Sequence, residues 1–401
     1  LTADCASPTS CSSSTRFGNL SLYVAYNNIP GQPAAVTEFS SYNNNGSAAN
    51  KKAYLGTNDG NNVYTVDIDI PADIAGITEA KGTARVLSVG QAMEAELDVV
   101  SRTPITDPLQ TSCVPAVAPC MISVSMQNTF KDFAISGSVL PRKEIVSNDK
   151  CNACHGLLGT ASGSNELNNA FHGGARNTIE SCALCHDAGR AGGYTMMNDV
   201  FKFPSTVLGG TATGYTMNES HHLKRMIHGI HGGAKTQYDF IHGPRATADN
   251  DWTEPENITA EVAYPGILSD CNTCHVNNSY QTDRGTIGST LLSTSTTSDP
   301  TSSRYNENYP LRTLLLTTVG ATSYVDPLKN PVISPKASSC TACHDSVGMI
   351  EHTIAGGATF GGKTQGQYLG GQVLETCDGC HEPGGYRGVD LVHQVGAVDA
   401  D

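Results

Sequence analysis

The sequence has few of the features that mark a membrane-spanning or nucleic-acid-binding protein. No apolar run approaches the roughly 18 residues that a membrane-spanning helix needs. Only 24 of the 401 residues are Lys or Arg, against 38 Asp and Glu, which gives a formal net charge of −14. Nucleic acids and anionic lipid surfaces attract basic proteins. We therefore expect no membrane span and no nucleic-acid partner.

Long helical periodicities are also scarce, above all after residue 142, where Gly, Ser, Thr and Asn dominate. This part of the chain is a poor candidate for an ordinary apolar core. The best short helix begins at Ser220 and ends at Gly229 or at Gly232-Gly233.

Residues 1–142 contain short β-branched runs separated by Gly, Asn and Pro, at 20–26, 63–70, 84–89 and 134–139. We expect a mixed, mostly irregular fold with two domains. Residues 1–142 would form an all-β split barrel or sandwich, and residues 143–401 a second domain of short helices and long loops.

The second domain is rich in cysteine followed by histidine. It contains five copies of Cys-x-x-Cys-His, the pentapeptide to which c-type haem is covalently attached. The motif cysteines are Cys151, Cys154, Cys182, Cys185, Cys271, Cys274, Cys340, Cys343, Cys377 and Cys380. The histidines that complete the motifs are His155, His186, His275, His344 and His381. In such a site the two thiols form thioether bonds to the porphyrin, and the adjoining imidazole is the proximal iron ligand.

Zinc binding is the main alternative for a Cys-x-x-Cys pair. With 13 His in the chain, the odds that a His follows all five pairs by chance are on the order of one in ten million. A His directly after a Cys is also poorly placed to join the same zinc tetrahedron. The motifs therefore predict five covalently attached haem c groups, which would supply the core of the second domain.

Eight further histidines are candidates for the five distal positions. They are His172, His221, His222, His228, His231, His242, His352 and His393. Methionines such as Met226 and Met349 are an alternative source of distal ligands. An iron with two His ligands has no open position for a substrate. The histidines therefore favour electron transfer over catalysis.

Four cysteines lie outside the motifs, and proximity favours disulfides between Cys5 and Cys11 and between Cys113 and Cys120. Disulfides and c-type haem indicate an oxidising compartment. We expect a protein exported through a cleaved signal peptide, located outside the cell or on its outer surface.

Several segments resemble one known family. His172-Gly173-Gly174-Ala175-Arg176 precedes the second motif, Met226-Ile227-His228-Gly229-Ile230-His231 and Tyr264-Pro265-Gly266 precede the third, and His352 and Val392-His393 follow the fourth and fifth. Over residues from about 145 to 395 the chain is similar to a pentahaem domain of the OmcA/MtrC family, the outer-membrane decahaem cytochromes of metal-reducing bacteria. That family alternates split-barrel and pentahaem domains twice, and this chain looks like one such half.

The resemblance implies which histidines bind iron on the distal side. The matching positions are His172, His228, His231, His352 and His393. His228 and His231 are three residues apart, so one helix face presents both, and we expect them to clamp two neighbouring haems. His221, His222 and His242 are then surplus.

The resemblance also implies a function. The family's haems form staggered crosses that pass electrons to minerals, flavins or partner cytochromes. We expect an extracellular pentahaem cytochrome that conducts electrons to other cytochromes, metal oxides, flavins or electrodes, and not an enzyme in the usual sense, although reduction of extracellular acceptors is compatible with it.

Three alternatives stay open: a multihaem reductase with one open haem, a monomeric soluble electron shuttle, and a subunit of a homo-polymeric cytochrome filament. For a filament we expect the haems at His155 and His381 to lie at opposite ends, and a surplus histidine to complete a neighbour's haem.

Overall fold

The structure is a computed structural model of the chain. It describes residues 20–27, 49–52, 57–58, 64–68, 81–98, 100–105, 121–159, 171–188, 220–233, 235–237, 241–242, 256–257, 262–281, 290–291, 297–299, 301 and 311–395. The four cysteines expected to form disulfides lie outside these ranges.

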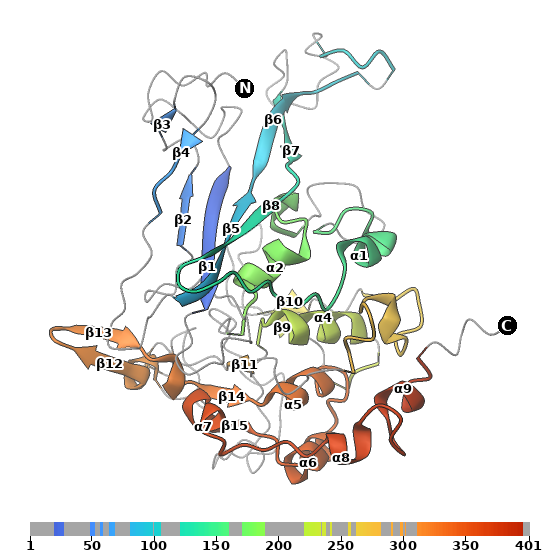
Figure 1. Cartoon of the computed structure of the whole chain (residues 1–401). Helices are drawn as coiled ribbons and strands as arrows, with labels where there is room; N and C mark the ends of the chain where they lie inside the picture. The colour runs from blue at the N-terminus through green and yellow to red at the C-terminus, as the bar shows by residue number, and fades with distance from the viewer. Residues whose placement is uncertain are drawn as a thin grey trace.

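The N-terminal part is built from antiparallel strands (Figure 1). A four-stranded sheet has the order β2 (Ala49–Lys52), β1 (Ser21–Asn27), β5 (Lys81–Val89) and β8 (Thr129–Ala134). Two hairpins accompany it: β3 (Thr57–Asn58) with β4 (Tyr64–Thr65), and β6 (Gln91–Ala95) with β7 (Met121–Ser125). The described strands form no closed barrel, so the split barrel or sandwich stays a prediction.

Both faces of the four-stranded sheet are apolar. Val24 is buried on one face and its neighbour Ala25 on the other, because successive side chains of a strand point to opposite sides. The Ala25 face, with Leu87, packs against Leu184 of the second Cys-x-x-Cys-His motif. The β part and the motif-bearing part therefore share a core instead of meeting only through a linker.

The rest of the described chain consists of short helices and small strand pairs. Before residue 300 these are α1 (Asn148–His155), η3 (Phe171–Gly174), α2 (Ile179–Cys185), α4 (Leu223–Gly232), β9 (Ile241–His242), β10 (Glu256–Asn257), η4 (Cys271–Thr273) and β11 (Thr290–Leu291). After it come η5 (Arg312–Leu315), β12 (Leu316–Val319), β13 (Thr322–Val325), η6 (Pro327–Lys329), β14 (Pro331–Ile333), α5 (Pro335–Cys340), α6 (Val347–Ala355), β15 (Phe360–Thr364), α7 (Gln365–Leu369), α8 (Asp378–His381) and α9 (Val389–Val392).

Side-chain caps start several of these helices. Ser147 and Ser346 accept hydrogen bonds from the free backbone N–H groups of α1 and α6, and Thr178 forms a capping box with Ser181 in α2. The helix expected from Ser220 begins three residues later and ends at Gly232, one of the two predicted ends.

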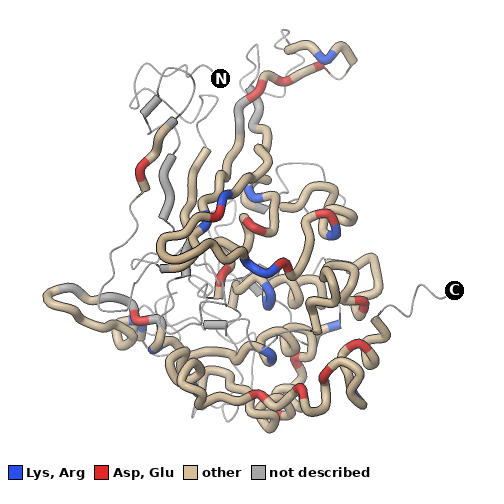
Figure 2. The backbone as a smooth tube through the Cα atoms, viewed as in Figure 1, with Lys and Arg blue, Asp and Glu red and all other residues tan. Residues whose placement is uncertain are grey.

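The C-terminal part has an apolar core of its own, which corrects the expectation that this composition could not provide one. Val332, Ile333, Ile350 and Phe360 are at most 3% exposed, around the sheet β11-β14-β15 and helix α6. A short buried strand can supply a core without helical periodicity. Figure 2 shows the described charged residues scattered along the backbone, with acidic positions prevailing around α6, α8 and α9. Within the described part of the chain, no helix combines the length and apolarity of a membrane span.

Candidate haem sites

Each of the five motifs closes one helical turn. In four of them the backbone N–H of the final His donates to the carbonyl of the first Cys, at 2.8 Å in the second motif and 2.9 Å in the last three. The first motif lies within α1. Residues three apart on a helical turn share a face, so this turn presents both thiols to one side with the imidazole beside them. That arrangement suits attachment of one porphyrin by two thioethers.

Each motif histidine lies beside one of the five distal candidates. The ring centroids are separated by 6.1 Å for His155 and His231, 6.2 Å for His186 and His172, 6.2 Å for His275 and His228, 5.8 Å for His344 and His393, and 6.1 Å for His381 and His352. The partners come from separate segments of the chain: η3, α4, α6 and the residue after α9.

These separations fit a haem iron between two imidazoles. Two rings that bind one metal from opposite sides hold their centroids about 6 Å apart, since each metal–nitrogen bond is about 2 Å and each ring adds about 1 Å. A zinc site fits less well, because structural zinc needs four ligands. Among the described residues no group of three or more His, Cys, Asp or Glu is arranged to hold a metal ion.

Hydrogen bonds orient half of these ten rings. Nδ1 donates to a backbone carbonyl in four of them: His186 to His221 and His231 to Ile227 at 2.9 Å each, His381 to Arg387 at 2.9 Å, and His393 to Val389 at 3.1 Å. In the fifth, Nδ1 of His275 lies 3.1 Å from Oγ of Ser279. Metal-binding histidines usually donate their second ring nitrogen in this way, which fixes the tautomer. In each of the five rings Nε2 is thereby left to face the iron.

Burial favours the neutral form of four of these rings, the form that binds a metal. It lowers the pKa of His228 to about 4, and it lowers the pKa values of His231, His275 and His344 below the usual range. Burial also raises the pKa of four motif thiols to about 11, namely those of Cys151, Cys182, Cys271 and Cys343. A zinc ligand or a redox-active cysteine needs a thiolate, whereas an uncharged thioether suits these apolar surroundings.

Helix α4 serves two motifs. Its His231 faces His155 of the first motif, and its His228 faces His275 of the third. The ring of Tyr264 stands edge-on to His231, with 5.7 Å between centroids. The α4 backbone also reaches a further motif, because Sγ of Cys343 donates to the carbonyl of His228 at 3.5 Å.

The motifs follow one another in space in an order that differs from the sequence. Oδ1 of Asn148, at the start of α1, accepts from the backbone N–H of Ile179 in α2, and Lys150 donates to the carbonyl of Asn272, so the first motif contacts both the second and the third. The third and fourth motifs meet at His228, whose ring faces His275 and whose carbonyl oxygen is 3.5 Å from Sγ of Cys343. The fourth and fifth meet where Lys336 of α5 pairs with Asp378. The expectation that His155 lies at an end of the row is therefore wrong.

Two of the surplus histidines are buried. His221 is 6% and His222 3% exposed. The centroid of the His221 ring lies 6.4 Å from that of His186. The backbone carbonyl of His221 also accepts the hydrogen bond from Nδ1 of His186. Neither side chain is at the surface, which does not favour the expectation that they complete a neighbour's haem; that expectation stays a prediction. The side chain of His242 lies outside the described part of the structure.

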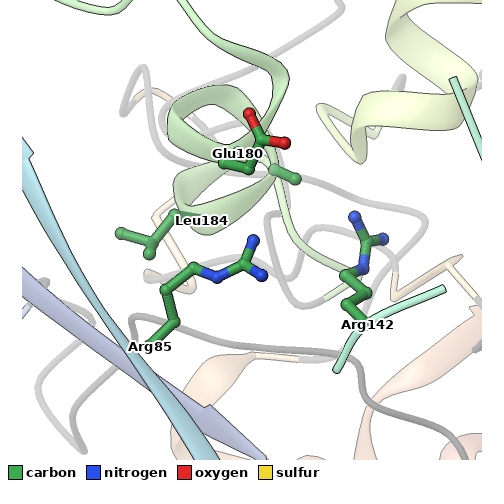
Figure 3. Close-up of a pocket in the computed structure, with 5 residues that line it drawn as sticks. Arg85, Arg142, Glu180 and Leu184 are labelled. Atoms are coloured by element: carbon green, nitrogen blue, oxygen red, sulfur yellow. The ribbon is translucent and has the colours of Figure 1, made fainter. Parts of the chain in front are cut away.

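A small pocket adjoins the second motif. It is lined by Arg85, Arg142, Glu180 and the two middle residues of the motif, Ala183 and Leu184. Figure 3 shows the Arg85 and Arg142 side chains on separate sides below the helix that carries Glu180. Arg85 is also paired with Asp132, through bonds of 2.7 and 3.0 Å. The pocket marks where the sheet meets the second motif.

Comparisons with known proteins show to which family the chain belongs. Residues 143–394 match the family model for the outer membrane cytochrome MtrC/MtrF-like, domains II/IV. The multiheme cytochrome MtrC of Shewanella baltica (strain OS185) is 35% identical over 71 residues, which is 17% of this chain and 10% of MtrC. The crystal structure of MtrC from Shewanella baltica OS185 has a TM-score of 0.41 and 15% identity, over 91% of this chain and 45% of that chain. The chain thus spans less than half the length of the MtrC structure. Because the family model covers more than half of this chain, the chain belongs to the OmcA/MtrC family of outer-membrane multihaem cytochromes.

Proposed function

We propose that this chain is a pentahaem c-type cytochrome that conducts electrons from haem to haem for extracellular electron transfer. The observation that carries the proposal is the set of five paired imidazoles, 5.8 to 6.2 Å apart, each with one ring from a Cys-x-x-Cys-His motif. We assign one haem to each motif, with His172, His228, His231, His352 and His393 as the distal ligands. We also propose residues 1–142 and 143–401 as the two domains.

When bound, each haem supplies an iron that accepts and returns one electron. The protein would hold these groups close together and would offer two imidazoles to each, which would leave no position for a substrate. His228 and His231 would each bind a different haem from the same helix, so the helix would fix the distance between these two haems. We propose that electrons pass through the haems in the order in which the motifs adjoin one another: second, first, third, fourth, fifth.

The partners we propose are other cytochromes and extracellular acceptors such as metal oxides, flavins or electrodes, and the location we propose is the outer cell surface or the exterior. The name of the matching family model, outer membrane cytochrome, supports this placement. Assembly into a filament gains no support from His221 and His222, because both are buried.

The test is to count the haems and determine their spin state. The mass of the intact chain, with a pyridine haemochrome assay, should give five haems per chain. Low-temperature electron paramagnetic resonance of the oxidised protein should show low-spin signals only, because two imidazoles give a strong ligand field. A measured value of four haems per chain would contradict the proposed five. A high-spin ferric signal of about one haem per chain, with rapid cyanide binding, would favour the multihaem reductase instead.

A further inference from the structure

A buried arginine lies against the fourth motif. Arg225, the third residue of α4, is 0% exposed. Its Nη1 donates to Oγ1 of Thr341 at 3.0 Å and to the carbonyl of Ser338 at 3.4 Å. Thr341 is the residue that follows Cys340 within the motif, and it is itself 1% exposed. Two hydrogen bonds of the guanidinium thus go to buried oxygens on either side of Cys340.

Helix α4, which carries Arg225, also lies against the second attachment cysteine. Sγ of Cys343 is 3.5 Å from the carbonyl oxygen of His228 in this helix. Arg225 and Cys343 are therefore brought together by the packing of α4 against the fourth motif.

A buried carboxylate lies on the same motif. Asp345 follows His344 directly and is 6% exposed, and its Oδ1 accepts a hydrogen bond of 2.8 Å from the backbone N–H of Gln237. Arg225 and Asp345 thus place two buried groups of opposite charge at one haem-attachment site.

We propose that Arg225 and Asp345 set the reduction potential of the haem attached at Cys340 and Cys343, Arg225 raising it and Asp345 lowering it. The inference rests on the proposed function, since it needs a haem at this motif. Reduction adds one electron to the ferric iron and yields the ferrous iron, so the charge of the site falls by one. A fixed cation in a poorly solvated site stabilises the added electron, and a fixed anion destabilises it. The fourth haem lies between the third and fifth in the row, where its potential controls flow in both directions.

The experiment is a spectroelectrochemical titration of the full chain with its haems attached. Arg225→Met should lower the equilibrium constant for reduction of one haem about tenfold, which is about 59 mV for one electron. Asp345→Asn should shift the same component upward. Arg225→Lys, which keeps the charge, should restore most of the potential. Lys329→Met removes one positive charge from an exposed position and should move no single component.

The affected haem is identified with His393→Met, because a thioether in place of the distal imidazole raises the potential. The component displaced by this change should be the one that Arg225→Met then shifts. Haem count and spin state are measured first in every variant, so a failure of the proposed function is recognised separately. Equal potentials in the wild type and in Arg225→Met would overturn the inference. So would an equal shift of all five haems, or a downward shift in Asp345→Asn. If Arg225→Met does not fold, the Lys and Asn variants decide the outcome by the same criteria.

Discussion

At the scale of single residues, the partner of each imidazole decides which iron it would bind. His228 and His231 lie on one helix, yet their rings face His275 and His155, which belong to different motifs. Because Nδ1 of His231 donates to Ile227 of the same helix, its ring orientation is set within α4. The His228 ring lies beside the third motif, with its centroid 6.2 Å from that of His275.

The pair gives a direct prediction about two haems. His228→Ala and His231→Ala should each leave one iron with five ligands, and the double variant two, because each ring faces a different motif histidine. Electron paramagnetic resonance of the oxidised protein should show one high-spin haem in each single variant and two in the double. His221→Ala is the control, because the group that accepts from His186 is its backbone carbonyl. Identical single-variant spectra with one high-spin haem in the double variant would contradict the clamp.

The buried His222 makes the free energy of unfolding depend on pH. Burial lowers its pKa well below the usual value of 6.5, so below that pH the unfolded chain binds a proton that the folded chain does not. The stabilising contribution is present above about pH 6.5 and decreases as the pH falls. His222→Gln should therefore lose less stability than the wild type between pH 7 and pH 5. Denaturation midpoints at both pH values test this, and parallel changes in the two proteins would exclude it.

At the scale of elements, α4 is the helix that ties the motifs together. It supplies His228 and His231, contacts Cys343, and packs on α5 through Lys224, whose Nζ donates to the carbonyl of Pro335 at 3.1 Å. A close approach between α4 and the fourth motif needs a small residue at the contact. Gly232, at the end of α4, occupies this position: a Cβ there would lie 3.2 Å from Sγ of Cys343 and 3.3 Å from Cγ2 of Thr236.

A matched pair of glycine substitutions tests this contact. Gly232→Ala should destabilise the protein by about 1 kcal/mol, because a sulfur tied to a haem cannot move aside easily. Gly348→Ala should be neutral or stabilising by up to about 1 kcal/mol, because that glycine lies in α6 and nothing is within 4 Å of the added Cβ. Thermal unfolding of the two variants makes the comparison. Equal effects of the two substitutions would show that the contact between α4 and the fourth motif does not require a glycine at position 232.

At the scale of the whole molecule, the sheet and the haem-binding part are joined by a buried pair of asparagines. The backbone N–H of Asn128 donates to Oδ1 of Asn177 at 3.1 Å, and that of Asn177 donates to Oδ1 of Asn128 at 2.8 Å. Their side-chain amides donate to the carbonyls of Ala175 and Met126. These bonds link the start of β8 to the segment between η3 and α2, which carries His172 at one end and the second motif at the other.

Loss of the hydrogen bonds between Asn128 and Asn177 should lower the free energy of unfolding of the protein. Asn177→Ala leaves the buried N–H of Asn128 and the carbonyl of Met126 without this partner, which should cost about 2 kcal/mol of unfolding free energy. Gln127→Ala, at the exposed neighbouring position, should change stability by less than about 0.5 kcal/mol. Chemical denaturation followed by haem absorbance and by far-ultraviolet circular dichroism measures both. A cost below 0.5 kcal/mol for Asn177→Ala would mean that the two parts are held together elsewhere.

The sequence by itself determined the chemistry of this protein. Cys-x-x-Cys-His is a local pattern, because one helical turn is enough to place two thiols and an imidazole on one side. The helix around His228 and His231 was likewise predictable, since its apolar spacing and terminal glycines are local signals. Family membership followed from short motifs of this kind.

The tertiary structure decided everything that joins distant segments. Which distal imidazole faces which motif depends on how α4, α6 and α9 pack. The position of the first motif between the second and third depends on the same packing, since spacing along the chain carries no such information. The burial of His221, His222, Arg225 and Asn177 was also hidden, because polar residues in a Gly- and Ser-rich sequence usually lie in solvent. Only the contacts of α4 and of the sheet reveal that these side chains are enclosed.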